Sequence, residues 1–149
     1  MQRGFTLLEA VMVLAIVAAV GTFALGMSFD DYRGDSARTE RATLVAVLER
    51  ARSQAMSNTC RGTGCTEGQP HGVHFTPDAY VLYQGPHFTT GDEANEQIDH
   101  VTKSTTISGE DVLFAPLSAT TTPEVITITD STGRTLTVTV GSEGQIISE

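Results

Sequence analysis

Cys60, Cys65, His71 and His74 form a cluster of potentially reactive side chains with the spacing C-x4-C-x5-H-x2-H. Thiolates and imidazoles are preferred zinc ligands, so a metal site is one interpretation. The gap between the two pairs is short for a zinc module, however, and the histidines stand closer together than usual. Two cysteines this near to each other also suit a locally stapled loop, and free thiols are a third alternative.

A lone carboxylate, Glu9, stands at the front edge of a long apolar stretch. Residues Ala10 to Phe29 carry no charge, and this length matches the roughly 20 residues that a helix needs to cross a bilayer. A buried core helix is the alternative, but a small domain rarely encloses a helix that is apolar on every face. A carboxylate beside membrane hydrocarbon is costly and needs a partner or a function. An exposed glutamate at the membrane surface is the simpler interpretation.

The charges on either side of the apolar stretch indicate its orientation. Arg3 precedes it, and Asp30 and Asp31 follow it, which favours a cytoplasmic N-terminus and an exported remainder. A secretory signal peptide would begin in the same way, but the apolar stretch is longer than a usual signal core. Disulfides persist outside the cytoplasm. The topology therefore favours a disulfide between Cys60 and Cys65, with no metal.

The segment Gly4-Phe5-Thr6-Leu7-Leu8-Glu9 resembles the type III signal sequence of type IV prepilins and type II secretion pseudopilins. The resemblance implies that a membrane prepilin peptidase cuts between Gly4 and Phe5 and that Phe5 is then N-methylated. It also implies that Glu9 pairs with the N-terminal ammonium of a neighbouring subunit. A glycine lets a protease approach the backbone closely. A charge pair among apolar helices is costly if unmatched, so pairing at Glu9 would enforce subunit register.

An amphipathic helix is predicted from Ser36 to Asn58. Its apolar residues recur at intervals of three and four and form one stripe, which we expect to pack against a sheet: Ala37, Leu44, Leu48, Ala51 and Ala55. Charged residues, including Arg38, Glu40 and Arg50, are predicted mostly on the other faces, and Glu49 with Arg52 is a plausible i,i+3 pair. The segment 30–35 is predicted to be a weak point or bend, and Gly26 is a poor helix former.

Short alternating runs after Asn58 predict antiparallel strands. They predict a hairpin of 72–75 and 79–83, a strand at 112–114, a second hairpin of 124–129 and 134–140 turned at 130–133, and a last strand at 146–147. Residues 85–103 are predicted to form a loop.

The expected fold class is α+β, with a long N-terminal helix packed on a C-terminal antiparallel β-sheet. The expected plan divides the chain into a leader (1–4), a transmembrane and assembly helix (5–29), its amphipathic continuation (30–58) and an extracytoplasmic β-sheet domain (59–149).

Two further segments resemble the H-class minor pseudopilins of type II secretion and related minor pilins. Leu48 to Ala55 resembles that family's motif at the end of the long helix, and Asp130 to Ile147 resembles its C-terminal strands. The resemblance implies a structural, minor subunit of a type II secretion pseudopilus or type IV pilus. Its partners would be the prepilin peptidase, other pilin or pseudopilin subunits and the inner membrane, before it enters the filament.

Two other functions are compatible with the sequence. One is a pilus-tip binding module for adhesion or DNA uptake, with the loop 85–103 or the Cys60–Cys65 loop as its contact surface. The other is an ordinary single-pass protein that is never polymerised.

DNA is an unexpected partner for this chain. Some members of the resembled group bind DNA through a Gly-Arg-any-Arg motif, but Leu136 replaces the second arginine after Gly133-Arg134. The net charge is −9, and a single arginine is a poor phosphate site.

Catalysis is not expected either. His87 and His100 belong to no motif and are expected at the surface. The sequence shows no nucleophile with its base, phosphate loop or paired acids, so we expect neither an enzyme nor a cofactor.

Overall fold

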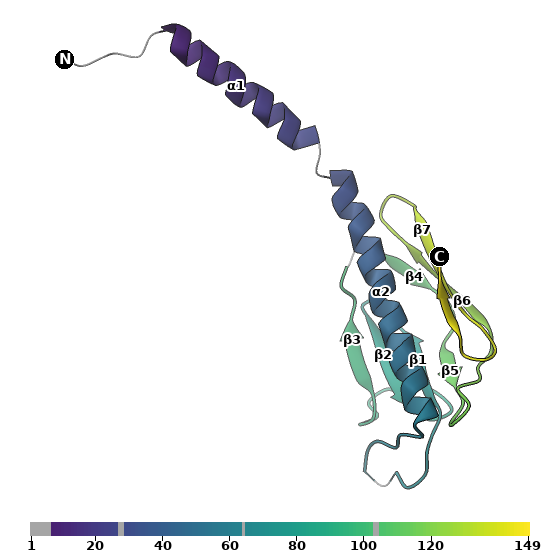
Figure 1. Ribbon diagram of the computed structural model, residues 1–149. Helices are drawn as coiled ribbons and strands as arrows, with labels where there is room; N and C mark the ends of the chain where they lie inside the picture. Colours follow the sequence, from purple (N-terminus) through teal and green to yellow (C-terminus); the bar gives the residue numbers. More distant parts are fainter. Residues whose placement is uncertain (1–6, 27–28, 64, 103–104) are drawn as a thin grey trace. The chain divides into compact units, whose positions relative to one another are not determined.

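The chain divides into two compact units, Met1–Gly34 and Asp35–Glu149. The computed structural model describes residues 7–26, 29–63, 65–102 and 105–149, and Figure 1 shows the elements in chain order. The described part of the first unit includes helix α1 (Leu7–Gly26), and helix α2 (Phe29–Met56) begins there and continues into the second unit.

Helix α1 exposes apolar side chains in every direction around its axis. Exposed residues occur at successive positions along the helix and not in a stripe: Leu7, Leu8, Val11, Met12, Val13, Leu14, Ile16, Val17 and Val20. No helix within the described residues is both long and apolar enough to cross a membrane. The predicted transmembrane segment 5–29 also includes residues outside those described.

Helix α2 includes the segment that was predicted to bend. Residues 30–35 are helical, so that prediction was wrong. One glycine costs a helix only about 1 kcal/mol, so Gly34 does not prevent a helix here. The poor helix former Gly26 is instead the last residue of α1.

Within the described residues, eight short strands form two antiparallel four-stranded sheets. The first sheet has the order β3-β2-β1-β5 and consists of β1 (His71–Phe75), β2 (Ala79–Gln84), β3 (Glu96–Asp99) and β5 (Val112–Phe114). The second has the order β4-β6-β7-β8 and consists of β4 (Thr106–Ser108), β6 (Glu124–Thr129), β7 (Thr135–Val140) and β8 (Ile146–Ser148).

The predicted α+β class and both predicted hairpins are confirmed. In the first hairpin Val73 pairs with Leu82, and in the second Ile126 pairs with Val138. Strands β3 and β4 were missed. Strand β3 lies inside the predicted loop 85–103, and its sequence EQID holds one apolar residue, so no alternation marked it.

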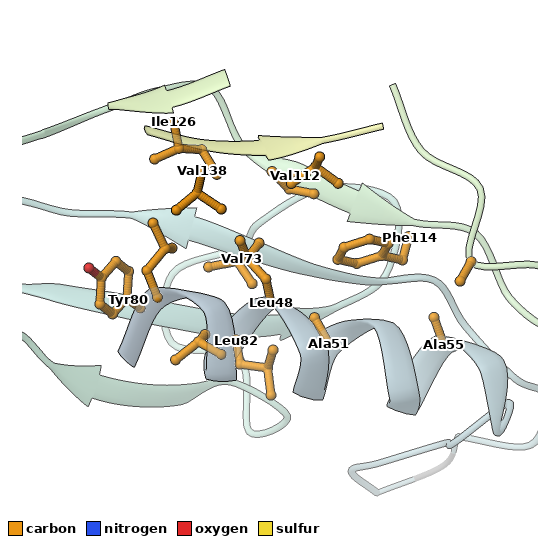
Figure 2. Close-up of a cluster of buried hydrophobic side chains, with 14 of the residues drawn as sticks. Leu48, Ala51, Ala55, Val73, Tyr80, Leu82, Val112, Phe114, Ile126 and Val138 are labelled. Atoms are coloured by element: carbon orange, nitrogen blue, oxygen red, sulfur yellow. The ribbon is translucent and has the colours of Figure 1, made fainter. Parts of the chain in front are cut away.

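The core lies where the apolar stripe of α2 meets both sheets. All five predicted stripe residues are buried: Ala37, Leu44, Leu48, Ala51 and Ala55. Figure 2 shows Leu48 among Val73 of β1, Leu82 of β2 and residues of the second sheet such as Val138. Ala51 and Ala55 belong to the same buried cluster. The predicted pair of Glu49 and Arg52 also forms, at 3.5 Å.

Leu48 and Leu117 offer a matched test of this core, because Leu48 is fully buried and Leu117 is 69% exposed. We predict that Leu48→Ala lowers the free energy of unfolding by about 2–5 kcal/mol, since it removes buried methyl groups and leaves a cavity. Leu117→Ala should change it by less than about 0.5 kcal/mol. Denaturant unfolding followed by circular dichroism measures both values. Equal losses in the two variants would contradict the described core.

Asp130 organises the turn between β6 and β7. Its Oδ1 accepts hydrogen bonds from the Thr132 hydroxyl at 2.6 Å, the Thr132 amide at 2.8 Å and the Arg134 amide at 3.0 Å. Gly133 supplies the positive φ of 82° that the turn requires. The Thr132 hydroxyl, helped by the two amides, lowers the pKa of Asp130 to about 2 although burial acts in the opposite direction.

A carboxylate whose pKa falls on folding stabilises the fold above its unfolded pKa, and that stabilisation disappears as pH drops through the folded pKa. We therefore predict that Asp130 contributes stability that is complete above about pH 4 and is lost towards about pH 2. Urea unfolding across this range should show a smaller loss in Asp130→Asn, with Thr132→Val intermediate. An unchanged acid dependence in Asp130→Asn would refute the role of this turn.

Candidate processing and assembly site

Of the residues predicted to act in processing and assembly, the structure describes Glu9. Gly4 and Phe5 lie outside the described residues. Glu9 lies in the first turn of α1 and is exposed. A carboxylate in this position interacts favourably with the positive end of the helix dipole. Glu9 is also the one charged residue in the sequence of α1.

The surface of α1 determines what this helix can contact. Beyond Glu9, its exposed side chains are overwhelmingly apolar, and they cover all faces of the helix. A helix that is hydrophobic all round is stable when other apolar groups surround it. Such a helix suits packing among similar apolar helices, with Glu9 placing an acidic group at its start.

The predicted disulfide is confirmed. Cys60 and Cys65 are bonded, with their Cα atoms 5.7 Å apart. Closing a loop this short stabilises the fold by about 2 kcal/mol in the chain-entropy account. Because each sulfur is bonded to the other, neither is available as a zinc thiolate.

The two histidines of the cluster make separate contacts. His71 Nε2 lies 2.9 Å from the Thr59 carbonyl oxygen, and burial lowers the pKa of His71, so its neutral ring donates to that carbonyl. His74 Nδ1 lies 2.8 Å from Asp111 Oδ1, and its ring stacks on Phe88 with centroids 4.0 Å apart. The zinc interpretation of the sequence is not supported by these partners.

The two loops that were predicted as alternative contact surfaces lie together. Gln84 at the end of β2 binds the disulfide loop, because its Oε1 accepts from the Arg61 amide at 2.7 Å and its Nε2 donates to the Arg61 carbonyl at 3.2 Å. Thr63 donates to Glu93 of the following loop at 3.3 Å. Residues from both loops line one open recess.

Glu96 of β3 joins these loops to α2. Its two carboxylate oxygens accept from both terminal nitrogens of Arg50, at 2.6 and 2.7 Å. Arg61 also contacts Glu96, at 3.1 Å. A bidentate arginine–carboxylate pair is among the stronger hydrogen-bonded pairs. Through Arg61 and Glu96, the disulfide loop is connected to β3 and to α2, and through Thr63 it is connected to the neighbouring loop.

Arg134, the one arginine of the incomplete Gly-Arg-any-Arg motif, already has a carboxylate partner. Arg134 Nε lies 3.1 Å from Asp130 Oδ2, and the Arg134 side chain is 57% exposed. Its charge is therefore partly balanced within the turn. This supports the expectation that this arginine is a poor phosphate site.

Two side chains, Glu40 and His100, lie elsewhere than the sequence predicts. Glu40 was expected mostly on a polar face but is fully buried, and His100 was expected at the surface although its side chain is 5% exposed. One signal was present: Glu40 follows Ala37 by three positions and precedes Leu44 by four, so it lies on the apolar stripe. His87 is exposed, as predicted.

Comparisons with known proteins identify a sequence motif, a related sequence and a similar fold. The family pattern described as the prokaryotic N-terminal methylation motif matches residues 1–25. Type II secretion system protein H of Escherichia coli (strain K12) is 38% identical over 82 residues, which are 54% of this chain and 43% of that protein. The aligned region thus spans less than half the length of this curated relative.

The fold has a counterpart among solved structures. The crystal structure of the type IV minor pilin FimU of Pseudomonas aeruginosa (strain PAO1) matches with a TM-score of 0.52 and 15% identity, over 78% of this chain and 91% of that one. This likeness concerns the fold. Together, the N-terminal motif, the related sequence and the shared fold make this chain similar to proteins of the type IV pilin-like superfamily.

Proposed function

We propose that this chain is a minor structural subunit of a type II secretion pseudopilus or a type IV pilus. It is made as a prepilin, cut between Gly4 and Phe5, N-methylated at Phe5 and assembled through its N-terminal helix. The observation that carries the proposal is α1, which pairs an apolar surface on all sides with one carboxylate in its first turn. The N-terminal methylation motif at residues 1–25 supports the processing steps.

The physical role of Glu9 follows from its position. Cleavage after Gly4 removes Arg3 and leaves an ammonium group on Phe5, which keeps its positive charge after methylation. Glu9 of one subunit then pairs with the ammonium of a neighbouring subunit. Because an uncompensated charge among apolar helices is strongly unfavourable, this pair selects one register between neighbouring helices.

The proposed location follows from the same motif. Before assembly the subunit is held in the inner membrane by its N-terminal segment, with its N-terminus in the cytoplasm and its β-sheet domain outside. The disulfide in that domain fits an oxidising compartment. The prepilin peptidase, other pilin or pseudopilin subunits and the membrane are its partners, and its role is structural.

Glu9→Ala tests the assembly step separately from processing. In cells with an active prepilin peptidase, we predict that mass spectrometry finds both wild type and variant beginning at methylated Phe5. Isolated filaments should contain the wild-type chain and be depleted of the variant, because the variant lacks the carboxylate that pairs with the neighbouring ammonium.

Glu49→Ala is a matched control, because Glu49 is an exposed glutamate on α2. It should enter filaments as the wild type does. Incorporation of Glu9→Ala at the wild-type level would defeat the charge-pairing account. A wild-type chain that still begins at Met1 would overturn the whole proposal.

A further inference from the structure

An acidic side chain lies in the core of the second unit. Glu40 of α2 is fully buried, and three groups surround its carboxylate. Oε1 accepts from the Tyr80 hydroxyl at 2.8 Å and lies 2.9 Å from His100 Nδ1, while Oε2 accepts from the Thr102 amide at 3.0 Å. Burying a carboxylate is costly unless it is paired and hydrogen-bonded, and here both oxygens are occupied.

These contacts fix a particular segment of the chain. His100 and Thr102 follow β3, an edge strand of the first sheet, and precede β4, an edge strand of the second. We call residues 100–102 the crossover segment. Through Glu40, this segment is fastened to α2, and through Tyr80 the same carboxylate is fastened to β2.

The geometry at His100 defines how many protons the site holds. His100 Nε2 lies 3.1 Å from the Thr76 carbonyl oxygen, which can only accept, so Nε2 carries a proton. Nδ1 faces Glu40 Oε1, and two bare acceptors would repel each other. One further proton must therefore lie between His100 and Glu40, as an imidazolium–carboxylate pair or as a neutral pair.

Among the described residues, Tyr80 is the other titratable side chain in direct contact with this pair. Burial, together with the hydrogen bond and charge of Glu40, raises the pKa of Tyr80 well above its usual range, so its hydroxyl remains a donor. Asp78 in the β1–β2 turn and Asp99 at the end of β3 are nearby in sequence and exposed. Asp78 contributes its backbone carbonyl, which accepts from the His100 amide at 3.0 Å.

We propose that Glu40 and His100 form a proton-dependent latch: the proton that they share holds the crossover segment on α2, and the fold that this latch stabilises becomes less stable relative to the unfolded chain as the pH rises above neutral. The latch goes beyond the proposed assembly role and does not depend on it. Its physical basis is the shared proton, without which the carboxylate and the neutral ring present lone pairs to each other in a buried site.

Proton linkage gives the direction of the effect. In an unfolded chain above neutral pH, glutamate is ionised and histidine is largely neutral, because their ordinary pKa values are about 4.3 and about 6.5. Unfolding therefore releases the shared proton, and stability falls as the pH rises. The unfolding equilibrium constant should increase by up to about tenfold per pH unit while the folded pair keeps its proton.

Glu40→Gln is the informative variant. A glutamine can accept from the Thr102 amide, while its NH2 group donates to a neutral His100 and to the Tyr80 oxygen. It can contact the same three partners without the extra proton, although the Tyr80 hydroxyl must then accept and turn its own proton away from residue 40. Denaturant unfolding of the full chain in a non-ionic detergent, from about pH 6.5 to about pH 9, should show the tenfold-per-unit dependence in the wild type and a clearly smaller one in Glu40→Gln.

His87→Gln serves as the matched control, because His87 is an exposed histidine, and it should keep the wild-type dependence. Equal pH dependence in wild type and Glu40→Gln would overturn the latch. Nitrogen NMR of the wild type provides an answer even if Glu40→Gln fails to fold. The expected spectrum at neutral pH shows His100 Nδ1 protonated or sharing a proton, and a bare Nδ1 would refute the proposal.

Discussion

The globular unit depends on one constraint, the burial of a single face of α2 against two sheets. Within the described residues, the strands pair into two separate ladders. Leu44 and Leu48 are fully buried, in one cluster with residues of both sheets such as Val73 and Val138. This helix face is therefore the surface that both sheets contact. Burying it stabilises the fold, because each Å² of apolar surface removed from water contributes roughly 25 cal/mol. The alanines of the stripe have short side chains, which lets the strands approach the helix backbone.

The same helix face also carries a carboxylate, and its surroundings explain how the core tolerates it. Glu40 occupies a stripe position, but each of its oxygens meets donors from β2 or from the crossover segment. A buried ion pair destabilises the fold when some of its hydrogen-bonding groups have no partner. When every group has a partner, the pair can fix the relative position of the elements that carry it. The Glu40 site therefore adds directional contacts to a helix–sheet interface that apolar packing alone leaves non-directional.

The N-terminal motif and the β-sheets are located in different compact units. The first unit contains the N-terminal motif and α1, whose exposed apolar surface calls for neighbours beyond its own chain. The second unit buries its own apolar face and ties its disulfide loop to Gln84 and Glu96 by short local contacts. Changes in these surface loops thus need not alter α1.

The sequence by itself determined the features whose signals are local. The segment Gly4 to Glu9, the stripe from Ala37 to Ala55, both hairpins and the cysteine pair each depend on spacings of a few residues, and such spacings set helix faces, strand faces and short loops directly. The tertiary structure alone decided that the strands divide into two sheets, that the polar run Glu96–Asp99 pairs with β2, and that Glu40 and His100 are buried. The physical reason is that strand pairing and side-chain solvation depend on neighbours brought close by folding. Glu40 meets Tyr80 across 40 positions of sequence and His100 across 60, which no local pattern records.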